Sequence, residues 1–442
     1  MIVSKLNAYV SEKEAICRKN DAIDPSLYSE HGVKKGLRDE NGNGVLAGLT
    51  NISKVTSSEM VDGVKVSRDG QLWYRGYRVE SLLDSLGDSL GYEKIAYLLL
   101  MGEIPSEAEL AEFSALIGEC RTLPSNFTRD VIMKAPSHDI MNSMTRSILT
   151  LASYDEQATD TSLSNSLLQC IRLISEFPLL AVYAYHAYNY SENMGSMVIH
   201  RPDPTLSTAE NFLMMLRPDR KYTATEAKVL DTALILHMEH GGGNNSTFTT
   251  RVITSSGSDT YSTVAAAMSS LKGPKHGGAN IKVMEMMDDI RAHVADPADK
   301  EAIADYLTKI INKEAFDRKG LVYGMGHAVY SLSDPRERVF RGYVETLAAE
   351  KGREKDLLLY QNVEEAAPIL IAKYRRIYKG VSPNVDFYSG FVYDMLGIPQ
   401  ELYTAMFAIA RIVGWSAHRI EELVCTDKII RPAYMSVMDE LE

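Results

Sequence analysis

Cysteine is scarce in this sequence, and its spacing excludes the usual cysteine-based frameworks. Cys17, Cys120, Cys170 and Cys425 lie far apart, and no two of them form a CxxC pair. Zinc sites and disulfide-stapled folds need cysteines at short or regular spacings. We therefore expect four reduced thiols, most of them in the core.

Long apolar runs are also missing. The sequence holds no stretch of 18 uninterrupted apolar residues, which argues against a membrane-spanning helix. Residues 1–8 lead quickly into charged residues and lack the apolar run of a signal peptide. We therefore expect a soluble, cytoplasmic protein with no membrane partner.

An excess of positive charge is absent as well. The 47 basic residues are outnumbered by 59 acidic ones, which gives a net charge of -12 and a pI of about 5.4. Because no global positive field would gather phosphates, a nucleic-acid partner is not expected. An anionic substrate would need a local cluster of arginines. The remaining composition, 45% hydrophobic over 442 residues, is that of a globular protein with a large core.

The periodicity of the apolar residues predicts a mostly helical fold. Residues 1–60 combine a short amphipathic pattern with a polar stretch, which indicates a peripheral arm. Residues 64–75 alternate around Asp69-Gly70, which predicts a β-hairpin and the one substantial sheet. From Val79 onward apolar residues recur at helical spacing. Helices are expected near residues 79–86, 95–99, 105–117, 128–134, 137–154, 163–190, 207–217, 223–240, 258–272, 278–294, 298–315, 335–351, 355–376, 390–396 and 399–425.

Two glycine-flanked histidines precede an aspartate in a turn-rich segment. His276 lies within residues 273–280, His327 within residues 324–330 and Asp386 within residues 380–390. Two imidazoles and one carboxylate form a candidate proton-transfer set. Taken alone, His276 is better explained as a turn histidine at a helix start, and the alternative is an uncharged donor to a developing oxyanion.

Two further histidines end an apolar helix that runs into three glycines. His237 and His240 are separated by one helical turn, so a metal site is an alternative, but the pattern is not HExxH and supplies no third ligand. A histidine held at a helix C-terminus against a ligand is favoured over a metal ligand. The glycines lack the Lys-Ser/Thr sequel of a phosphate-binding P-loop.

Three arginines are candidates for holding an anion. Arg336 follows Asp334-Pro335 in the first turn of a predicted helix, where a cation opposes the helix dipole. It is therefore either a solvated surface residue or a ligand of an anion. Arg411 lies in an apolar run, where it is costly unless it meets a carboxylate or phosphate. With Arg431, these residues could bind a polycarboxylate.

At these residues the chain resembles the citrate synthase family. The resemblance rests on four blocks, which come in the family's order, with a further match at residues 74–80. The blocks are His240 with its following glycines and asparagine, residues 275–280, residues 326–330 with 334–336, and residues 384–390. It covers roughly residues 60–440 and implies an all-α, two-domain fold with a minor N-terminal hairpin.

The resemblance implies a role for each candidate. Asp386 would remove a proton from the acetyl methyl of acetyl-CoA while His276 hydrogen-bonds the enolate oxygen. His327 would polarise the ketone of oxaloacetate and protonate the new alkoxide. The citryl-CoA would then be hydrolysed to citrate and CoA. This is the chemistry of an acyltransferase of the tricarboxylic acid cycle, which needs neither a cofactor nor a metal.

The resemblance also implies the ligand contacts. His240, Arg336 and Arg411 would bind oxaloacetate, and Arg431 would be contributed by the other subunit of a homodimer. The CoA contacts would be Val322, Gly324 and Gly326 at the adenine and Lys379 at a phosphate. Ser331 departs from the family, in which many members carry Lys or Arg, and Lys319 and Arg318 are the candidate replacements.

Finally, the resemblance implies two domains and leaves two rival functions. Residues 1–275 and 391–442 would form the large domain and residues 276–390 the small one, which would close when oxaloacetate binds. A 2-methylcitrate synthase would use propionyl-CoA with the same residues, and one methylene discriminates only roughly 10–200-fold. A non-catalytic CoA-binding scaffold is the alternative from another class.

Overall fold

Helices make up most of the computed structural model, which describes residues 2–39, 44–327, 329–375, 380–425 and 427–438. The chain divides into two compact units, Met1–Gly48 and Leu49–Glu442. Within the described residues there are 17 α-helices and one three-stranded sheet. This confirms the predicted all-α class with a minor sheet. The predicted division at residues 276 and 390 stays a prediction.

The first unit holds two helices, α1 (Ile2–Asn20) and α2 (Pro25–Glu30). Asp24 caps α2 by accepting a hydrogen bond from the Ser26 amide at 2.8 Å. The sequence predicted only a short amphipathic pattern here, whereas α1 spans 19 residues. Its apolar residues Leu6, Tyr9 and Val10 are exposed.

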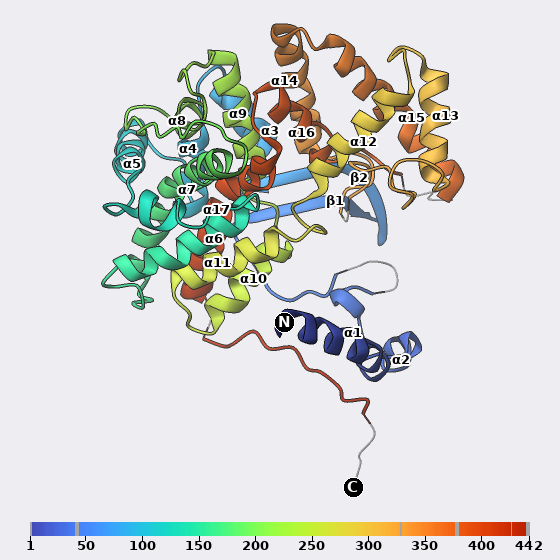
Figure 1. Ribbon diagram of the computed structural model, residues 1–442, viewed down its shortest axis with the longest axis horizontal. Coiled ribbons are helices and arrows are strands. Elements are labelled where there is room, and N and C mark those ends of the chain that lie inside the picture. Colours follow the sequence, from blue (N-terminus) through green and yellow to red (C-terminus); the bar gives the residue numbers. More distant parts are fainter. Residues whose placement is uncertain (1, 40–43, 328, 376–379, 426, 439–442) are drawn as a thin grey trace. The chain divides into compact units, whose positions relative to one another are not determined.

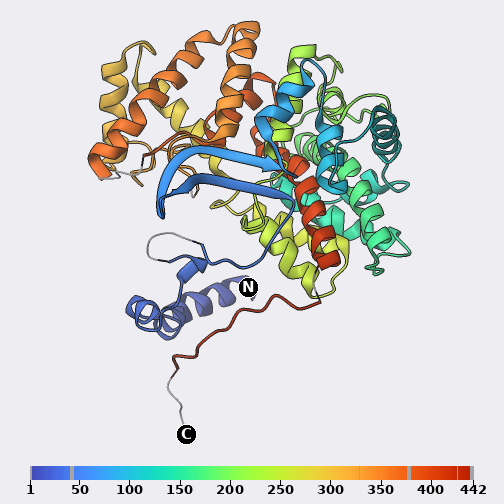
Figure 2. The same cartoon turned by 180° about the vertical axis from the view of Figure 1, so that it is seen from behind.

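The sheet of the second unit has the order β1 (Ser53–Val61), β2 (Val64–Tyr74) and β3 (Tyr77–Arg78), with antiparallel pairing throughout. The predicted turn at Asp69-Gly70 is wrong. The hairpin turns at Asp62-Gly63, where both residues have positive φ, 50° and 78°. Such angles fit the two-residue turns that join twisted strands. Figure 2 shows β1 and β2 as a long curved ribbon.

Asp69 and Gly70 lie in an irregularity of β2 instead. Thr56 pairs with Gln71 and Ser58 with Ser67, so residues 68–70 bulge out of the ladder. The Gly70 amide donates to the Ser333 carbonyl at 3.2 Å, and a Cβ on Gly70 would lie 2.2 Å from that oxygen. The Ser333 hydroxyl donates to Asp69 at 2.7 Å. The glycine therefore serves a close approach of the hairpin to residues 329–333.

A long helix, α17 (Tyr403–Cys425), packs against α4, α7, α9, α10 and α11. Figure 1 shows α13 and α15 gathered away from α5–α8. The remaining α-helices are α3 (Val79–Leu86), α4 (Tyr92–Met101), α5 (Glu107–Glu119), α6 (Ile140–Leu151), α7 (Leu163–Glu192), α8 (Thr208–Leu216), α9 (Ala224–His237), α10 (Asn245–Ser255), α11 (Thr260–Leu271), α12 (Ala279–His293), α13 (Lys300–Ile311), α14 (Pro335–Lys351), α15 (Glu354–Arg375) and α16 (Val385–Met395).

Local capping explains many of these helix starts. Ser106, Ser207 and Thr223 each form a capping box with a glutamate three residues later, at α5, α8 and α9. Asp334 caps α14 and Asn384 caps α16. In the part of the chain that the structure describes, one helix, α7, is long and apolar enough to cross a membrane by length and composition, but 78% of its most apolar window is buried in the protein. It is the core helix that packs on α17, α6 and α8.

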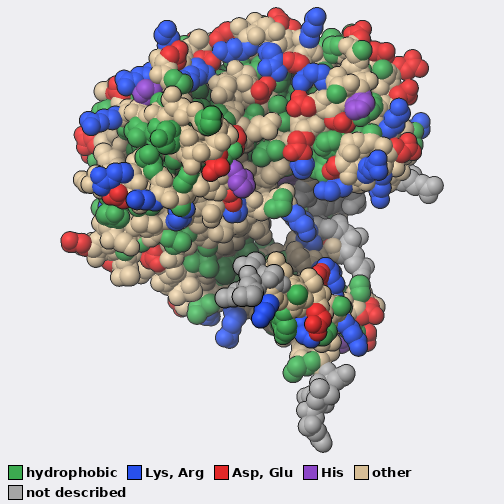
Figure 3. Space-filling view, in the orientation of Figure 1, with side chains coloured by type: hydrophobic (Ala, Val, Ile, Leu, Met, Phe, Trp, Pro, Cys, Tyr) green, Lys and Arg blue, Asp and Glu red, His purple; other side chains and the backbone are tan. Residues whose placement is uncertain are grey.

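The cysteines and surface charges complete the fold. All four cysteines are free, as expected, but only Cys170 is buried; Cys17 and Cys425 are exposed and Cys120 is half-buried. The prediction that most of them lie in the core is therefore wrong. On the face in Figure 3, basic and acidic side chains are interspersed without a continuous basic area.

Candidate active site

Asp386 lies in the first turn of α16, not in an irregular turn before a helix that starts at residue 390. The Asn384 side chain caps this helix by accepting a hydrogen bond from the Asp386 amide at 2.9 Å. Burial raises the pKa of the carboxyl to about 6; Arg336 opposes this shift and Asp334 adds to it. No hydrogen bond to the carboxylate is found among the described residues. A half-buried carboxylate with free lone pairs and a raised pKa suits a general base.

A glycine loop fixes His327 relative to Asp386. The Gly326 amide donates to the Ser382 carbonyl at 2.8 Å, and the Asn384 amide donates to the Gly324 carbonyl at 2.9 Å. Gly324 has φ +78°, and a Cβ there would lie 2.9 Å from the Phe387 ring. Backbone hydrogen bonds therefore join the segment before His327 to the segment before Asp386.

His327 presents a ring whose tautomer is set by the backbone. Its Nδ1 accepts hydrogen bonds from the amides of Val329 at 3.0 Å and Tyr330 at 3.2 Å. Because an amide can only donate, Nδ1 is the acceptor and the proton of the neutral ring lies on Nε2. The ring stacks on Tyr330 with centroids 4.7 Å apart and meets the His240 ring edge-on at 5.0 Å. His327 can thus donate from Nε2 to a ligand oxygen.

His240 follows the end of α9 and is kept neutral. Its Nε2 lies 3.2 Å from the Tyr330 hydroxyl. Burial, then the charge of Arg336, holds the pKa of His240 well below its ordinary value. His237 instead stacks on Phe407 at 3.9 Å. The ring of His240 contacts those of His327 and Tyr330, and no group of three metal-ligating side chains occurs among the described residues.

Two buried arginines face this region. Arg336 is only 4% exposed, so the alternative of a solvated surface residue is wrong. It donates to both oxygens of Asp334, at 3.0 and 2.7 Å, and this pairing raises its pKa although burial alone would lower it. Arg411 donates from Nε to the His237 carbonyl at 2.7 Å, while its Nη1 is buried without a partner in the described part of the chain. An unpaired buried donor on a guanidinium fits a ligand carboxylate.

His276 precedes α12 and faces Ser246. Its Nε2 accepts from the Ser246 amide at 3.4 Å and lies 3.1 Å from the Ser246 hydroxyl, which accepts from the Trp415 indole at 3.1 Å. Burial, then the charge of Arg411, lowers the pKa of His276 to about 4. The ring is therefore neutral near pH 7, with its proton on Nδ1. It meets the requirement for an uncharged donor to an oxyanion.

The structure brings six of the predicted residues into one electrostatic neighbourhood. The pKa shifts of His240, His276, Arg336, Arg411 and Asp386 each include an effect from at least one other member of the set, and the rings of His240 and His327 are in contact. The sequence predictions missed the side chains that hold this set in place. These are Ser246 and Trp415 beside His276, and Tyr74, whose hydroxyl donates to the carbonyl of Glu239, the residue before His240. Their only sequence signal was proximity to a motif or an apolar helix.

Other predicted residues are not joined to the set. Arg431 is exposed in the extended segment after α17, and no described contact links it to these six residues. Lys379 lies outside the described residues. Val322 is a buried core residue, while Gly324 and Gly326 form the loop before His327 with φ of +78° and +86°. Lys319 is one of the candidate replacements for a basic residue at position 331. Its Nζ lies 3.9 Å from Oδ2 of Asp317.

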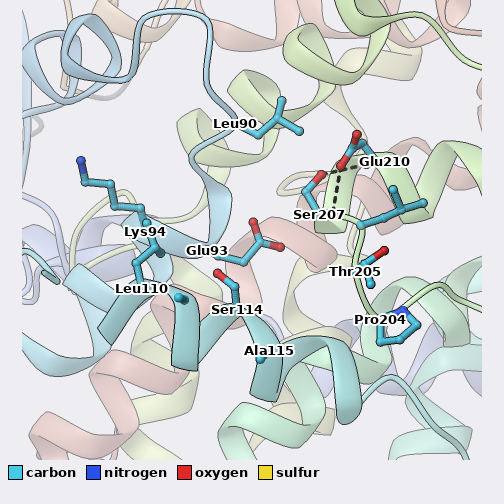
Figure 4. Close-up of a pocket in the computed structure, with 12 residues that line it drawn as sticks. Leu90, Glu93, Lys94, Leu110, Ser114, Ala115, Pro204, Thr205, Ser207 and Glu210 are labelled. Carbon is cyan, nitrogen blue, oxygen red and sulfur yellow. Dashed lines mark hydrogen bonds between the residues drawn. The ribbon is translucent and has the colours of Figure 1, made fainter. Parts of the chain in front are cut away.

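A cavity of about 490 Å³ lies elsewhere, between α4, α5 and α8 (Figure 4). Glu93 and Lys94 line it on α4, and the Ser207–Glu210 capping pair lies at its edge. None of the predicted site residues lines it. Glu93 is already paired with Arg121 and accepts from Thr208, so the cavity wall is held by structural contacts.

Comparisons with known proteins identify the family of this chain. Residues 41–433 match the family described as citrate synthase, C-terminal domain. A citrate synthase of Synechocystis sp. is 34% identical over 382 residues, which cover 86% of this chain and 87% of that protein. A 2-methylcitrate synthase of Corynebacterium glutamicum is 31% identical and covers 91% of this chain and 95% of its own length.

Solved structures give the same result. The ternary complex of carboxymethyl-coenzyme A and oxaloacetate with citrate synthase from Thermoplasma acidophilum superposes with a TM-score of 0.75 at 29% identity, covering 92% of this chain and 97% of that chain. The citrate synthase of Pyrobaculum aerophilum gives 0.73 at 28% identity, with 91% and 93% coverage. The chain belongs to the citrate synthase family.

Proposed function

We propose that this protein is a citrate synthase, which condenses acetyl-CoA with oxaloacetate and hydrolyses citryl-CoA to citrate and CoA. The observation that carries the proposal is that a base of raised pKa, Asp386, and a neutral donor, His276, both lie within the influence of the buried Arg411. The α-proton of a thioester is very weakly acidic, so a carboxylate can remove it only if the enolate is stabilised as it forms. The two residues supply these two requirements.

In the first step Asp386 accepts a proton from the acetyl methyl. The negative charge moves to the thioester oxygen, where Nδ1–H of His276 donates a hydrogen bond. An uncharged imidazole suits this role because its pKa of about 4 keeps it from becoming a cation that would repel Arg411. The product is an enolate, and the base is left protonated.

In the second step the enolate carbon attacks the ketone carbon of oxaloacetate. Nε2–H of His327 donates to the ketone oxygen and passes its proton to the new alkoxide. Arg336, Arg411 and His240 would hold the carboxylates of oxaloacetate, and the buried, unpaired Nη1 of Arg411 supports this assignment. Water then gives a proton back to His327 and attacks the thioester carbonyl of citryl-CoA. The C–S bond breaks, and the departing thiolate takes the proton held by Asp386 and leaves as CoA.

The remaining assignments belong to the same proposal. Val322, Gly324, Gly326 and Lys379 would contact CoA, and Arg431 would reach the site of a partner subunit in a homodimer. The reaction would take place in the cytoplasm, as a step of the tricarboxylic acid cycle, without a cofactor. The known complex of a family member with a CoA analogue and oxaloacetate supports the two ligands.

A second candidate is 2-methylcitrate synthase. The 31% identical relative of that name favours it, because the same proton-transfer residues would serve propionyl-CoA. The scaffold alternative is disfavoured because His276, His327 and Asp386 are all present. The two enzymatic candidates differ only in the acyl group that the site accepts.

Release of free thiol from acetyl-CoA or propionyl-CoA, in the presence of oxaloacetate, tests these functions. We expect the higher kcat/KM with acetyl-CoA; the reverse order would support the second candidate, and no thiol from either would support the scaffold. In Asp386→Asn the rate should fall roughly 100-fold or more, because an amide cannot accept the proton. Asp305→Asn, at an exposed position on α13, is the matched control. Near-normal activity in Asp386→Asn would remove Asp386 from its role.

A further inference from the structure

A buried chain of polar side chains behind the site takes part in none of the steps above. It runs from Arg251 on α10 to His418 on α17 and to Glu239, the residue directly before His240. Neither His418 nor Glu239 has any exposed surface. Burying such groups is costly unless their hydrogen bonds are made, so the chain of contacts needs a structural reason.

The hydrogen bonds determine where the protons lie. Arg251 donates to Nδ1 of His418 from Nε at 3.1 Å and from Nη2 at 2.7 Å. A guanidinium has no acceptor, so Nδ1 must accept, and the proton of the ring lies on Nε2. Nε2–H donates to Oε1 of Glu239 at 2.9 Å. Although burial opposes its charge, His418 and then Arg411 keep the pKa of Glu239 at about 2.

Glu239 in turn is hydrogen-bonded to the backbone next to His240. Its Oε1 also accepts from the Gly241 amide at 2.6 Å and from the Ser53 hydroxyl at 2.8 Å. Gly241 has φ +88°, so the chain bends sharply directly after His240. The Tyr74 hydroxyl lies 3.1 Å from the Glu239 carbonyl and donates to it. The backbone is thus held on both sides of His240.

We propose that Glu239 and His418 are positioning residues that fix His240 for binding oxaloacetate. The inference rests on the proposed function, because it takes His240 as a ligand of oxaloacetate. Glu239 binds the amide that follows His240, His418 orients the Glu239 carboxylate, and Arg251 fixes the tautomer of His418. Ser53 extends the same support to the first residue of β1.

The proposal explains why one oxygen of Glu239 accepts three hydrogen bonds while the other has none. Oε1 receives Gly241, Ser53 and His418, whereas Oε2 is buried and unpartnered within the described residues. If the carboxylate served only as a counter-charge, its three donors would not need to bind the same oxygen. Convergence on Oε1 instead fixes the position of the turn.

The matched variants Glu239→Leu and Glu239→Gln test the positioning role. Leucine removes the acceptor, and we expect the KM for oxaloacetate to rise roughly tenfold or more, as for the loss of a hydrogen bond to a charged group. Glutamine keeps an oxygen for the three donors and places its NH2 where Oε2 lacks a partner, so it should recover most of that loss. In Glu239→Leu, the KM for acetyl-CoA and the kcat at saturating oxaloacetate should each change less than threefold. The same should hold for Glu239→Gln.

His418 offers an independent pair. Glutamine can accept from Arg251 and donate to Glu239, whereas phenylalanine can do neither. We expect His418→Phe to raise the KM for oxaloacetate and His418→Gln to restore it in part. If either apolar variant fails to fold, as judged by its thermal midpoint, Ser53→Ala at the half-buried start of β1 replaces it, with an expected rise of a few-fold.

Two results would overturn the proposal. The first is an unchanged KM for oxaloacetate in Glu239→Leu or, where that variant does not fold, in Ser53→Ala. The second is an equal loss of kcat and of affinity for both substrates, which would show a general structural role. His240→Ala separates this inference from the proposed function. If it raises the KM for oxaloacetate and Glu239→Leu does not, only the positioning role fails; if wild type shows no condensation, the proposed function fails.

Discussion

At the scale of single residues, the protonation states of Asp386 and His276 set the working pH. The base must be ionised to accept a proton, and its pKa is raised to about 6. His276, with a pKa of about 4, stays neutral over the same range. Activity should therefore fall as the pH drops below about 6, with one proton taken up by Asp386.

The pH dependence of kcat/KM for acetyl-CoA in wild type measures this effect. We expect the acidic limb of this profile near pH 6, because burial raises the pKa of Asp386 above that of an ordinary aspartate. The residue that opposes the shift most strongly is Arg336, so removing its charge should move the limb to higher pH. A limb near the ordinary aspartate value of 3.8 would contradict the assignment of the raised pKa to the catalytic base.

The identity of these residues was predictable from the sequence, but their environments were not. Glycine-flanked histidines and an arginine in an apolar run indicate chemistry without a fold, and in the structure the charge of Arg411 acts on His276. Although the pairing of Arg336 with Asp334 is local, the support of His276 by Ser246 depends on contacts between segments 30 residues apart. No local pattern encodes them, which is why Glu239 and His418 were also missed.

At the scale of elements, Glu226 joins three segments across the start of α9. It accepts from Arg217 at 2.7 and 2.8 Å and from Lys351, in the last turn of α14, at 2.6 Å. Burial opposes its charge, but Arg217 and then Lys351 lower its pKa to about 2 from the ordinary 4.5. The contact stabilises the packing of α14 on α9.

Glu226→Gln should lower the free energy of unfolding by about 1–3 kcal/mol, the cost of losing hydrogen bonds to a charged group. Because the folded pKa is depressed, this contribution is present above pH 4.5 and is lost as the pH falls toward 2. Urea unfolding at pH 7 and at pH 3 measures both effects. Glu301→Gln, at an exposed first-turn position of α13, is the control. An equal loss in both variants would show that the ion pairs contribute nothing.

Element boundaries show where sequence patterns fail. Asp69-Gly70 carried the expected hairpin signal, but that glycine is required for contact with Ser333, while Asp62-Gly63 makes the turn. The helix α10 was missed because its threonines, serines and β-branched residues have low helix propensity, and packing against α11 and α17 decides instead. Long apolar helices such as α7 and α17 were predicted within a few residues.

At the scale of the whole molecule, the predicted small domain should close on the large one when oxaloacetate binds. Asp386 lies on α16 and Arg411 on α17, so a ligand that bridges them would favour the closed arrangement. Small-angle scattering with and without oxaloacetate should show a smaller radius of gyration in its presence. Arg411→Leu is the control, since it should bind the ligand weakly. No compaction in wild type would contradict closure.

The last prediction concerns Arg431, which no contact among the described residues brings to the site. If each site in a homodimer takes this residue from the partner, two inactive variants should complement each other. Subunits carrying Arg431→Ala retain Asp386, and subunits carrying Asp386→Asn retain Arg431. In a mixed dimer one site then receives both residues and the other neither. Random mixing places half of the dimers in this form, so thiol release should recover to about a quarter of wild type.

The alternative gives a different result. If Arg431 acted within its own chain, each site of the mixed dimer would lack one of the two residues, and co-expression of the variants would recover nothing. The separately purified variants, mixed without subunit exchange, give the baseline in either case. Because both arrangements need the same residues, only complementation distinguishes them; the exposed position of Arg431, beyond the end of α17, is consistent with an arginine that acts on a second chain.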